Sequence, residues 1–520
     1  MNNIISIYGS HDASVTFLDS NNKLKVLEYE RFVRNRYAMF SERFDGRSLG
    51  SNDKDRRKFL SYIKSQINYE VEKIVYNELS NLDLQLITEY FPNAKFELCG
   101  HHLAHAASGY YLSGFDKALI LSIDGGGQDY NEVSFTKIFK GDKSIIPLTI
   151  PSINLGGAYG KIGCPISEIK PGPDSNTDSL VYAGKVMGLC AYGNVRNEWL
   201  EFMANYYNSP DLSLDILGNV MGLDLNFNSL KEQLSYDLAA TSQYVFEQFV
   251  LEILKPYINE YDNFILVGGC ALNVLFNQRF KKLLDKKNKN LYIPSNPNDC
   301  GLSLGQYLIH NPNVDVNVYS GFDILDRDKF EYYKDKYHAH KIDTQEIVAL
   351  LKEGKIIGLV EGYSEIGPRA LGNRSIICDP SFPNMKDTLN AKVKFREWFR
   401  PFAPVCRLED KDIFFDDAYE SEFMSYAPNV KEQYKQQLKT ITHEDGTARL
   451  QTVTKDQHST FYNILSELDK LGEIPVILNT SFNIKGRPIL TTIEDALYCL
   501  DNTQMDYVII EDWLFKRKIK

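Results

Sequence analysis

The sequence lacks several features that would assign it to a specialised class of protein. Its longest apolar runs, such as ALILSI, have the length of a β-strand and are too short to cross a bilayer. With 58 Lys and Arg against 69 Asp and Glu, the net charge of −11 argues against a large nucleic-acid-binding surface. The N-terminus has neither a basic nor a long apolar segment, so no signal peptide is expected and a cytoplasmic location is predicted.

Paired cysteines are also missing. None of the eight cysteines lies in a CxxC pair, and several occur in apolar runs such as SIICDP. We therefore expect buried free thiols, and neither disulfides nor a zinc knuckle. The composition is otherwise that of a soluble globular protein, and 520 residues are too many for one core, so two or three domains are expected.

Glycine-rich turns follow two predicted strands. The apolar segment ALILSI leads into Asp124 and three glycines, and the segment FILV leads into Gly268 and Gly269. Glycines at strand ends let backbone N–H groups approach phosphates, because no Cβ stands in the way. With a predicted β-meander over the first thirty residues, this order resembles the actin-like ATPase (ASKHA) fold. A charged segment near residues 335–345 predicts a domain boundary.

Histidines are few, yet three of the nine lie within five residues of one another, in HHLAH. His101 and His105 are spaced so that on a helix they share one face, one turn apart. That arrangement suits one metal ion, and Asp124 and Asp299, at the ends of predicted elements, are candidates for the missing ligands. The spacing alone leaves a second interpretation equally open, a pair of helix-surface or capping histidines.

Basic residues occur in short apolar or glycine-rich motifs throughout the C-terminal half. Several such groups converging would form a cradle for phosphate and carboxylate groups. Asn479 and Ser481 follow the apolar segment PVIL and add neutral hydrogen-bonding groups. The alternative is that each basic residue forms a structural salt bridge. That alternative explains one or two basic residues more easily than four. The basic residues are Arg369, Lys394, Arg400 and Arg449.

Five motifs of the N-terminal half resemble those of the NodU/CmcH-type O-carbamoyltransferases. In chain order they are HHLAHAASGYYLSGF, DGGG, GKVMGLCAYG, GGCALN and NPNDCGLSLG. The C-terminal motifs resemble the same family. The resemblance spans nearly the whole chain. It implies an α/β actin-like ATPase-fold domain over residues 1–340 and an α+β YrdC-like domain over residues 341–520. The implied enzyme makes carbamoyladenylate from carbamoyl phosphate and ATP. It then transfers the carbamoyl group to a hydroxyl of a small-molecule acceptor, a natural product or a sugar.

The resemblance also implies a role for each candidate residue. His11, in the turn HDAS with Asp12, would deprotonate the acceptor hydroxyl, and imidazole titrates near neutral pH. Iron(II) or another divalent transition metal would be bound by His101, His105, Asp124 and Asp299. Carbamoyl phosphate and ATP, with magnesium, would be bound by Arg369, Lys394, Arg400, Arg449, Asn479 and Ser481. Carbamoyladenylate would be bound by Arg36, Lys185, Gly268, Gly269 and Asn273.

Two positions depart from the family pattern, and three other classes of protein compete. Arg36 stands where lysine is usual, and Arg487 where glutamate is frequent. A tRNA threonylcarbamoyl transferase would lack the C-terminal motifs, and a hydrogenase-maturation carbamoyl carrier would show CxxC zinc fingers. A non-enzymatic actin-like module would not need the basic motifs. The expected partners are ATP, carbamoyl phosphate and the acceptor, with no nucleic acid and no membrane; a homodimer is left open.

Overall fold

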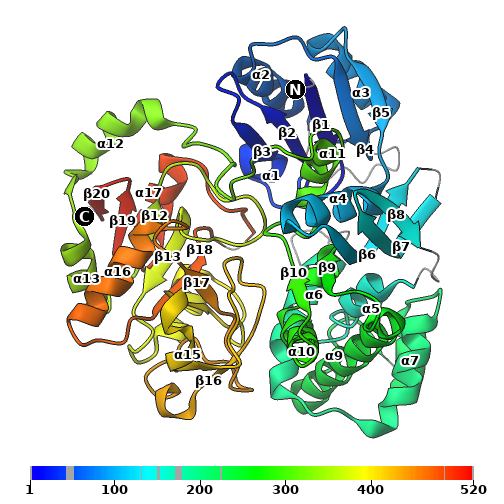
Figure 1. Cartoon of the computed structure of the whole chain (residues 1–520). Helices are drawn as coiled ribbons and strands as arrows, with labels where there is room; N and C mark the ends of the chain where they lie inside the picture. The colour runs from blue at the N-terminus through cyan, green and yellow to red at the C-terminus, as the bar shows by residue number, and fades with distance from the viewer. Residues whose placement is uncertain are drawn as a thin grey trace. The chain divides into compact units, whose positions relative to one another are not determined.

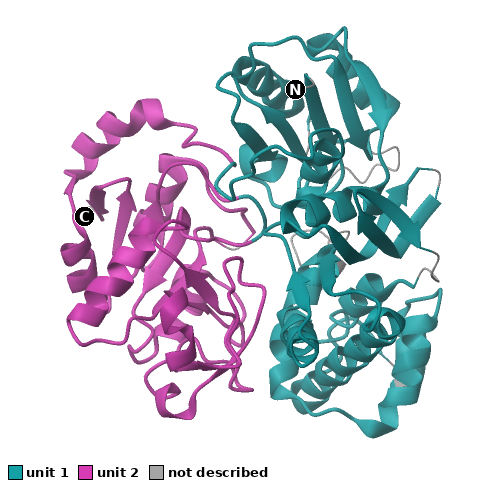
Figure 2. Ribbon diagram, in the orientation of Figure 1, with its two compact units in different colours: residues 1–320, 366–368 teal, residues 321–365, 369–520 magenta. Residues whose placement is uncertain are grey.

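The computed structural model divides the chain into two compact units (Figure 2). Unit 1 comprises residues 1–320 and 366–368, and unit 2 comprises residues 321–365 and 369–520. The division thus falls before residue 340, where the charged segment predicted a boundary. The structure describes residues 3–41, 52–130, 132–148, 153–169, 178–222, 225–484 and 486–517, without the side chains of 178, 179 and 220.

Unit 1 contains a first five-stranded sheet in the order β3-β2-β1-β4-β5 (Figure 1). The first three strands pair antiparallel as a meander, as the sequence predicts, and β4 and β5 continue parallel to β1. Every residue of the meander strands is buried, which explains their nearly continuous apolar and β-branched sequence. The strands are β1 (Ile4–Tyr8), β2 (Ser14–Leu18), β3 (Leu24–Glu28), β4 (Lys73–Asn77) and β5 (Lys95–Leu98).

The second sheet of unit 1 repeats this topology in the order β8-β7-β6-β9-β10. Again the first three strands pair antiparallel and the last two run parallel to the first strand of the meander. The amino-acid sequence shows no internal repeat, so the duplication appears only in the strand pairing. The strands are β6 (Lys117–Asp129), β7 (Glu132–Asp142), β8 (Ser144–Leu148), β9 (Asn263–Val267) and β10 (Asn290–Tyr292).

Two helices of unit 1, α4 (His101–Ser113) and α11 (Leu302–His310), cross at close range (Figure 1). A Cβ built on Gly305 of α11 would lie 1.8 Å from the carbonyl oxygen of Ala104 in α4, so only glycine allows this approach. The other helices are α1 (Tyr29–Val33), α2 (Asp53–Gln66), α3 (Asn81–Tyr90), α5 (Leu155–Lys161), α6 (Asp178–Leu189), α7 (Leu200–Asn208), α8 (Leu214–Met221), α9 (Glu232–Leu254) and α10 (Val274–Asp285).

Unit 2 is built on an eight-stranded mixed sheet in the order β11-β20-β19-β12-β13-β18-β14-β17. One apolar cluster packs α13 and α16 against one face of the sheet. A second cluster covers the opposite face with residues of α12 and α17. The strands are β11 (His340–Lys341), β12 (Ile357–Val360), β13 (Arg374–Cys378), β14 (Ala403–Arg407), β17 (Gln451–Val453), β18 (Ile477–Ser481), β19 (Tyr507–Ile510) and β20 (Trp513–Lys516).

A short separate ladder joins β15 (Phe415–Asp416) to β16 (Asn429–Val430). The helices of unit 2 are α12 (Phe330–Tyr337), α13 (Thr344–Lys352), α14 (Met385–Thr388), α15 (Lys411–Phe414), α16 (Ser459–Lys470) and α17 (Ile493–Asn502). All eight cysteines are free thiols, and seven of them are buried. Among the described residues, no helix combines the length and apolarity needed to cross a membrane.

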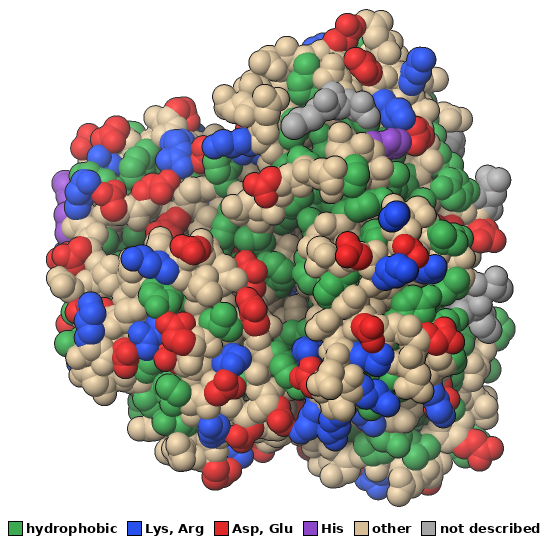
Figure 3. Space-filling view, viewed as in Figure 1, with side chains coloured by type: hydrophobic (Ala, Val, Ile, Leu, Met, Phe, Trp, Pro, Cys, Tyr) green, Lys and Arg blue, Asp and Glu red, His purple; other side chains and the backbone are tan. Residues whose placement is uncertain are grey.

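Acidic and basic side chains are interspersed over most of the face drawn in Figure 3. Several of the lysines near the end of α10 have acidic partners: Lys281 contacts Asp285, and Lys289 lies 3.0 Å from Asp262. The surface charge is therefore locally compensated there, and exposed pairs of this kind contribute little to stability.

Candidate functional site

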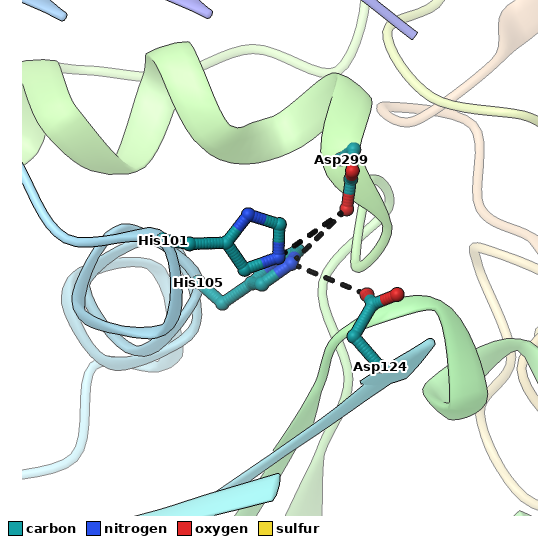
Figure 4. Close-up of side chains that lie close together, drawn as sticks. All are labelled: His101, His105, Asp124 and Asp299. Carbon is teal, nitrogen blue, oxygen red and sulfur yellow. Dashed lines mark ion pairs between the residues drawn. The ribbon is translucent and has the colours of Figure 1, made fainter. Parts of the chain in front are cut away.

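Four side chains of unit 1 converge on one point (Figure 4). The Nε2 atom of His105 lies 3.4 Å from Asp124 Oδ2 and 3.3 Å from Asp299 Oδ1. The Nε2 atom of His101 lies 3.7 Å from the same Asp299 oxygen. All four residues are buried, and one candidate ligand atom from each lies within 4.8 Å of the others. The arrangement brings together the four residues that the sequence analysis named as metal ligands.

Local sequence explains how these side chains meet. Helix α4 begins at His101, so His101 and His105 lie one turn apart near its N-terminus. Asp124 lies where the register of β6 against β7 shifts, between Ile123 and Gly127. A Cβ on Gly127 would lie 2.2 Å from the His101 ring, so the third glycine of the DGGG motif makes room for the imidazole.

Both histidines of the cluster are fully buried, at 0% exposure. No ring nitrogen of His101 or His105 makes a hydrogen bond within the described part of the chain. Burial lowers the pKa of His101 to about 4, whereas at His105 the two carboxylates outweigh burial and raise the pKa to about 9. Surface or capping histidines would not be enclosed in this way. Two imidazoles and two carboxylates are a donor set that fits a divalent transition metal.

The carboxylate of Asp124 is held by backbone N–H groups. Its Oδ2 accepts from Gly269 N at 2.6 Å, and its Oδ1 accepts from Gly125 N at 2.6 Å. Burial opposes ionisation of Asp124, but the contact with His105 outweighs it and keeps the pKa below its usual value. Gly268 has a φ of +86°, and a Cβ there would lie 2.1 Å from Ile123 O. The predicted glycine turn therefore packs directly against the aspartate strand.

Asp299 has a second set of contacts through Oδ2. The hydroxyl of Tyr8 donates to this oxygen at 2.7 Å, and His11 Nε2 lies 3.4 Å from it. His11 Nδ1 in turn lies 3.2 Å from Asp12 Oδ2. Burial opposes protonation of His11, but Asp299 and Asp12 outweigh it and raise its pKa to about 10. The sequence analysis missed Tyr8, whose only local signal is its position at the end of the first apolar strand.

The other residues predicted to bind carbamoyladenylate lie in different surroundings. Asn273 caps α10 by accepting from Phe276 N at 3.1 Å, and it exchanges two hydrogen bonds with the Gln243 amide. The Arg36 guanidinium lies 4.7 Å from the centroid of the Tyr37 ring. Lys185 is buried within α6. Of this predicted set, the structure places Gly269 in direct contact with the Asp124 carboxylate, and Gly268 beside it.

Arginine side chains converge in unit 2. Burial lowers the pKa of Arg369 to about 10, with a further contribution from the charge of Arg400. Burial also lowers the pKa of Arg449, and the charges of Arg369 and Arg400 lower it further. Arg400 also lies 3.7 Å from Glu397, but the arginines still lower one another's pKa, and this excess of positive charge favours an anion.

A fourth arginine, Arg396, belongs to this cluster, and the sequence analysis missed it. Burial lowers its pKa, and the charges of Arg400 and Arg449 lower it further. Its Nε donates to Asn390 Oδ1 at 2.7 Å, and its guanidinium lies over the Phe402 ring. Its presence in the motif KFREWFRPFAP, beside Lys394 and Arg400, was the available signal.

Lys394 is bound to the loop that follows β18. Its ammonium group donates to Ser481 O at 2.6 Å, to Asn483 O at 2.8 Å and to the side chain of Asn483. Ser481 Oγ lies 3.3 Å away. The structure thus joins two predicted substrate-binding residues, Lys394 and Ser481, through direct hydrogen bonds.

Comparisons with known proteins identify the family of this chain. Residues 59–308 match the family model Carbamoyltransferase N-terminus, and residues 348–517 match Carbamoyltransferase C-terminus. Uncharacterized protein MJ1051 of Methanocaldococcus jannaschii is 30% identical, and the similarity covers 99% of each chain. The 3'-hydroxymethylcephem-O-carbamoyltransferase of Streptomyces clavuligerus is 29% identical over 64% of each chain. The chain belongs to the carbamoyltransferase family, which confirms the resemblance, and it is an enzyme of the transferase class.

Among solved structures, full-length HypF in its phosphate- and nucleotide-bound form is similar at 15% identity. The similarity covers 59% of this chain and 55% of that chain, with a TM-score of 0.35. This score is too low to support an argument about fold or function.

Proposed function

We propose that this carbamoyltransferase is ATP-dependent and uses two sites. Unit 2 makes carbamoyladenylate from carbamoyl phosphate and ATP, and unit 1 transfers the carbamoyl group to a hydroxyl of a small-molecule acceptor, a natural product or a sugar. The mutual electrostatic influence of four arginines in unit 2 supports this most strongly, because their positive charge exceeds the charge of Glu397, which lies 3.7 Å from Arg400, and so favours an anionic ligand. The duplicated sheet topology supports an actin-like ATPase fold for unit 1, and we assign a YrdC-like fold to unit 2.

In unit 2, water first cleaves carbamoyl phosphate to carbamate and phosphate. A carbamate oxygen then attacks the α-phosphorus of ATP, pyrophosphate leaves, and the mixed anhydride carbamoyl-AMP forms. Arg369, Arg396, Arg400 and Arg449 offset the negative charge on the phosphoryl groups. Magnesium accompanies ATP. Lys394 fixes the end of β18 at Ser481.

In unit 1, the His101, His105, Asp124 and Asp299 cluster fits a divalent transition metal, of which iron(II) is one. A metal ion held by these four residues would supply positive charge to polarise the carbamoyl carbonyl and to offset the carboxylates that raise the pKa of His11. Neutral His11 accepts the proton of the acceptor hydroxyl as its oxygen attacks the carbonyl carbon. Asp12 orients the imidazole through its contact with Nδ1. The N–H groups of Gly268 and Gly269 donate to Pro297 O and Asp124 Oδ2, so this turn positions the Asp124 carboxylate.

The test is release of pyrophosphate from ATP by the purified protein, with and without carbamoyl phosphate. Carbamoyl phosphate should be required, and AMP should appear only when an acceptor is added. Carbon-labelled carbamoyl phosphate, supplied with ATP and an extract of the source organism, should label the acceptor. Pyrophosphate release that does not depend on carbamoyl phosphate would refute the proposed adenylation.

A further inference from the structure

The side-chain amide of Asn479 is held in one orientation. Asn479 lies in β18 and is fully buried, at 0% exposure. Its Nδ2 donates to Ala370 O at 2.9 Å and to Gln451 Oε1 at 2.8 Å. Gln451 is fixed in turn, because its Nε2 donates to Leu371 O at 2.9 Å. Turning either amide over would place its oxygen against a backbone carbonyl oxygen, so the network defines which atom of each amide is the acceptor.

This network leaves the Asn479 carbonyl oxygen without a partner. Among the described residues, no group donates a hydrogen bond to Asn479 Oδ1. A buried acceptor that has lost water and gained no donor is costly, so a ligand that donates would be favoured here. The oxygen is held in place by the loop that follows Arg369, since Ala370 and Leu371 supply the two backbone carbonyls.

The other unpartnered groups of this region can donate, since a hydroxyl both donates and accepts and an arginine Nε only donates. Ser375 in β13 pairs with Ser481 in β18, so its side chain lies on the same face of the sheet as those of Ser481 and Asn479. The Ser375 hydroxyl has no partner in the described part of the chain, and neither has the Nε of Arg369 or Arg449. The site therefore offers several donors and one fixed acceptor.

We propose that Asn479 Oδ1 accepts a hydrogen bond from the carbamoyl NH2 group, and that Gln451 is the positioning residue that orients the Asn479 amide for this contact. The inference rests on the proposed function, which places carbamoyl phosphate in unit 2. Within carbamoyl phosphate the amino group is the only donor, since the carbonyl and phosphate oxygens accept. Acetyl phosphate carries a methyl group at the same place. It would leave Asn479 Oδ1 dehydrated and unpaired, so the pair Gln451–Asn479 selects a carbamoyl over an acetyl group.

The experiment compares the KM for carbamoyl phosphate with the inhibition constant of acetyl phosphate, both measured through pyrophosphate release. The wild-type protein should favour carbamoyl phosphate by about tenfold to a hundredfold. Gln451→Met removes one of the two acceptors that orient the Asn479 amide, the other being Ala370 O, and should lower that ratio, chiefly through weaker binding of carbamoyl phosphate. Gln457→Met, a glutamine whose side chain accepts from Thr454 N outside the cluster, should leave the ratio unchanged.

Gln451→Glu is the second variant, and it keeps the test usable if Gln451→Met does not fold. Its carboxylate still accepts from Asn479 Nδ2, so the Asn479 amide stays oriented and the ratio should stay close to that of the wild type. The ratio cancels any change in general anion affinity caused by the added charge. A wild-type ratio in Gln451→Met, or a lowered ratio in Gln451→Glu, would overturn the inference. A changed KM for ATP at constant ratio would also overturn it, because Asn479 would then contact the nucleotide. If wild type releases no pyrophosphate with carbamoyl phosphate, the proposed function itself fails.

Discussion

The hydroxyl of Tyr8, at the end of the first strand, donates a 2.7 Å hydrogen bond to Oδ2 of Asp299. The other oxygen of that carboxylate, Oδ1, faces both His101 and His105. Tyr8 therefore fixes the orientation of a candidate metal ligand without facing the metal position itself. Partners of this kind influence metal affinity because they hold the ligand in its binding geometry.

Tyr8→Phe should lower metal affinity by about tenfold to a hundredfold. The ring is retained and only the hydrogen bond to Asp299 is lost, so little change in melting temperature is expected. Metal dissociation constants from competition with a coloured chelator check this. Tyr76→Phe, on the neighbouring strand β4, is the matched control and should bind metal like the wild type. Equal affinities in all three proteins would show that Tyr8 has no positioning role.

Gly127→Ala should abolish metal binding, whereas Gly125→Ala in the same glycine run should not. The added methyl group at Gly127 would lie 2.2 Å from the His101 ring, and the ring would have to leave its position. At Gly125 the nearest atom, Gly157 N, is 3.7 Å away, which is an ordinary contact. Metal content per chain, measured by elemental analysis after reconstitution, separates the two variants. Normal metal content in Gly127→Ala would contradict the assignment of His101.

Arg400→Ala should slow carbamoyl phosphate-dependent release of pyrophosphate by about a hundredfold or more, because phosphoryl charge is left uncompensated. Arg407→Ala is the control, since Arg407 lies on β14 and pairs with Asp410 and Asp469 outside the cluster. Synthetic carbamoyladenylate should restore carbamoyl transfer in Arg400→Ala. A wild-type rate of pyrophosphate release would leave Arg400 with only a structural role.

His11→Ala should separate the two half-reactions. A base for the acceptor has no role in adenylation, so the variant should still release pyrophosphate at neutral pH while transferring no carbamoyl group. Some transfer should return at high pH, where the acceptor hydroxyl loses its proton more readily. Pyrophosphate and labelled product measured in one reaction provide the readout. A parallel loss of both activities with a lower melting temperature would instead indicate that His11 supports the fold.

The amino-acid sequence by itself determined the features that depend on local periodicity. The spacing of His101 and His105 follows from the helical repeat, and the end of β9 at Val267 follows from an apolar run that stops at Gly268. The strand end predicted at Asp124 is wrong, because β6 continues to Asp129 through a register shift in the glycine run. Asp299 and the basic motifs of the C-terminal half were candidates from their local context, and the family resemblance assigned their roles. These signals were sufficient to place the metal cluster and most of the arginine cluster.

Tertiary structure alone decided the contacts between residues distant in the sequence. Tyr8 reaches Asp299 because α11 packs on the first sheet, and Gln451 reaches Asn479 because β14 brings β17 and β18 into one sheet. No periodic pattern encodes such pairs, since each depends on how separate elements register against one another.

The boundary between the two units also depends on contacts that the sequence alone does not reveal. Residues 366–368 belong to unit 1 although the surrounding chain belongs to unit 2. Gly367 N donates to Glu28 Oε1 at 2.8 Å, and Arg31, buried beside Glu28, donates to Gly367 O at 2.6 Å. The sequence determined where charged and apolar segments alternate. The buried Glu28–Arg31 pair holds residues 366–368 in unit 1, because buried charges and buried backbone groups require hydrogen-bonding partners.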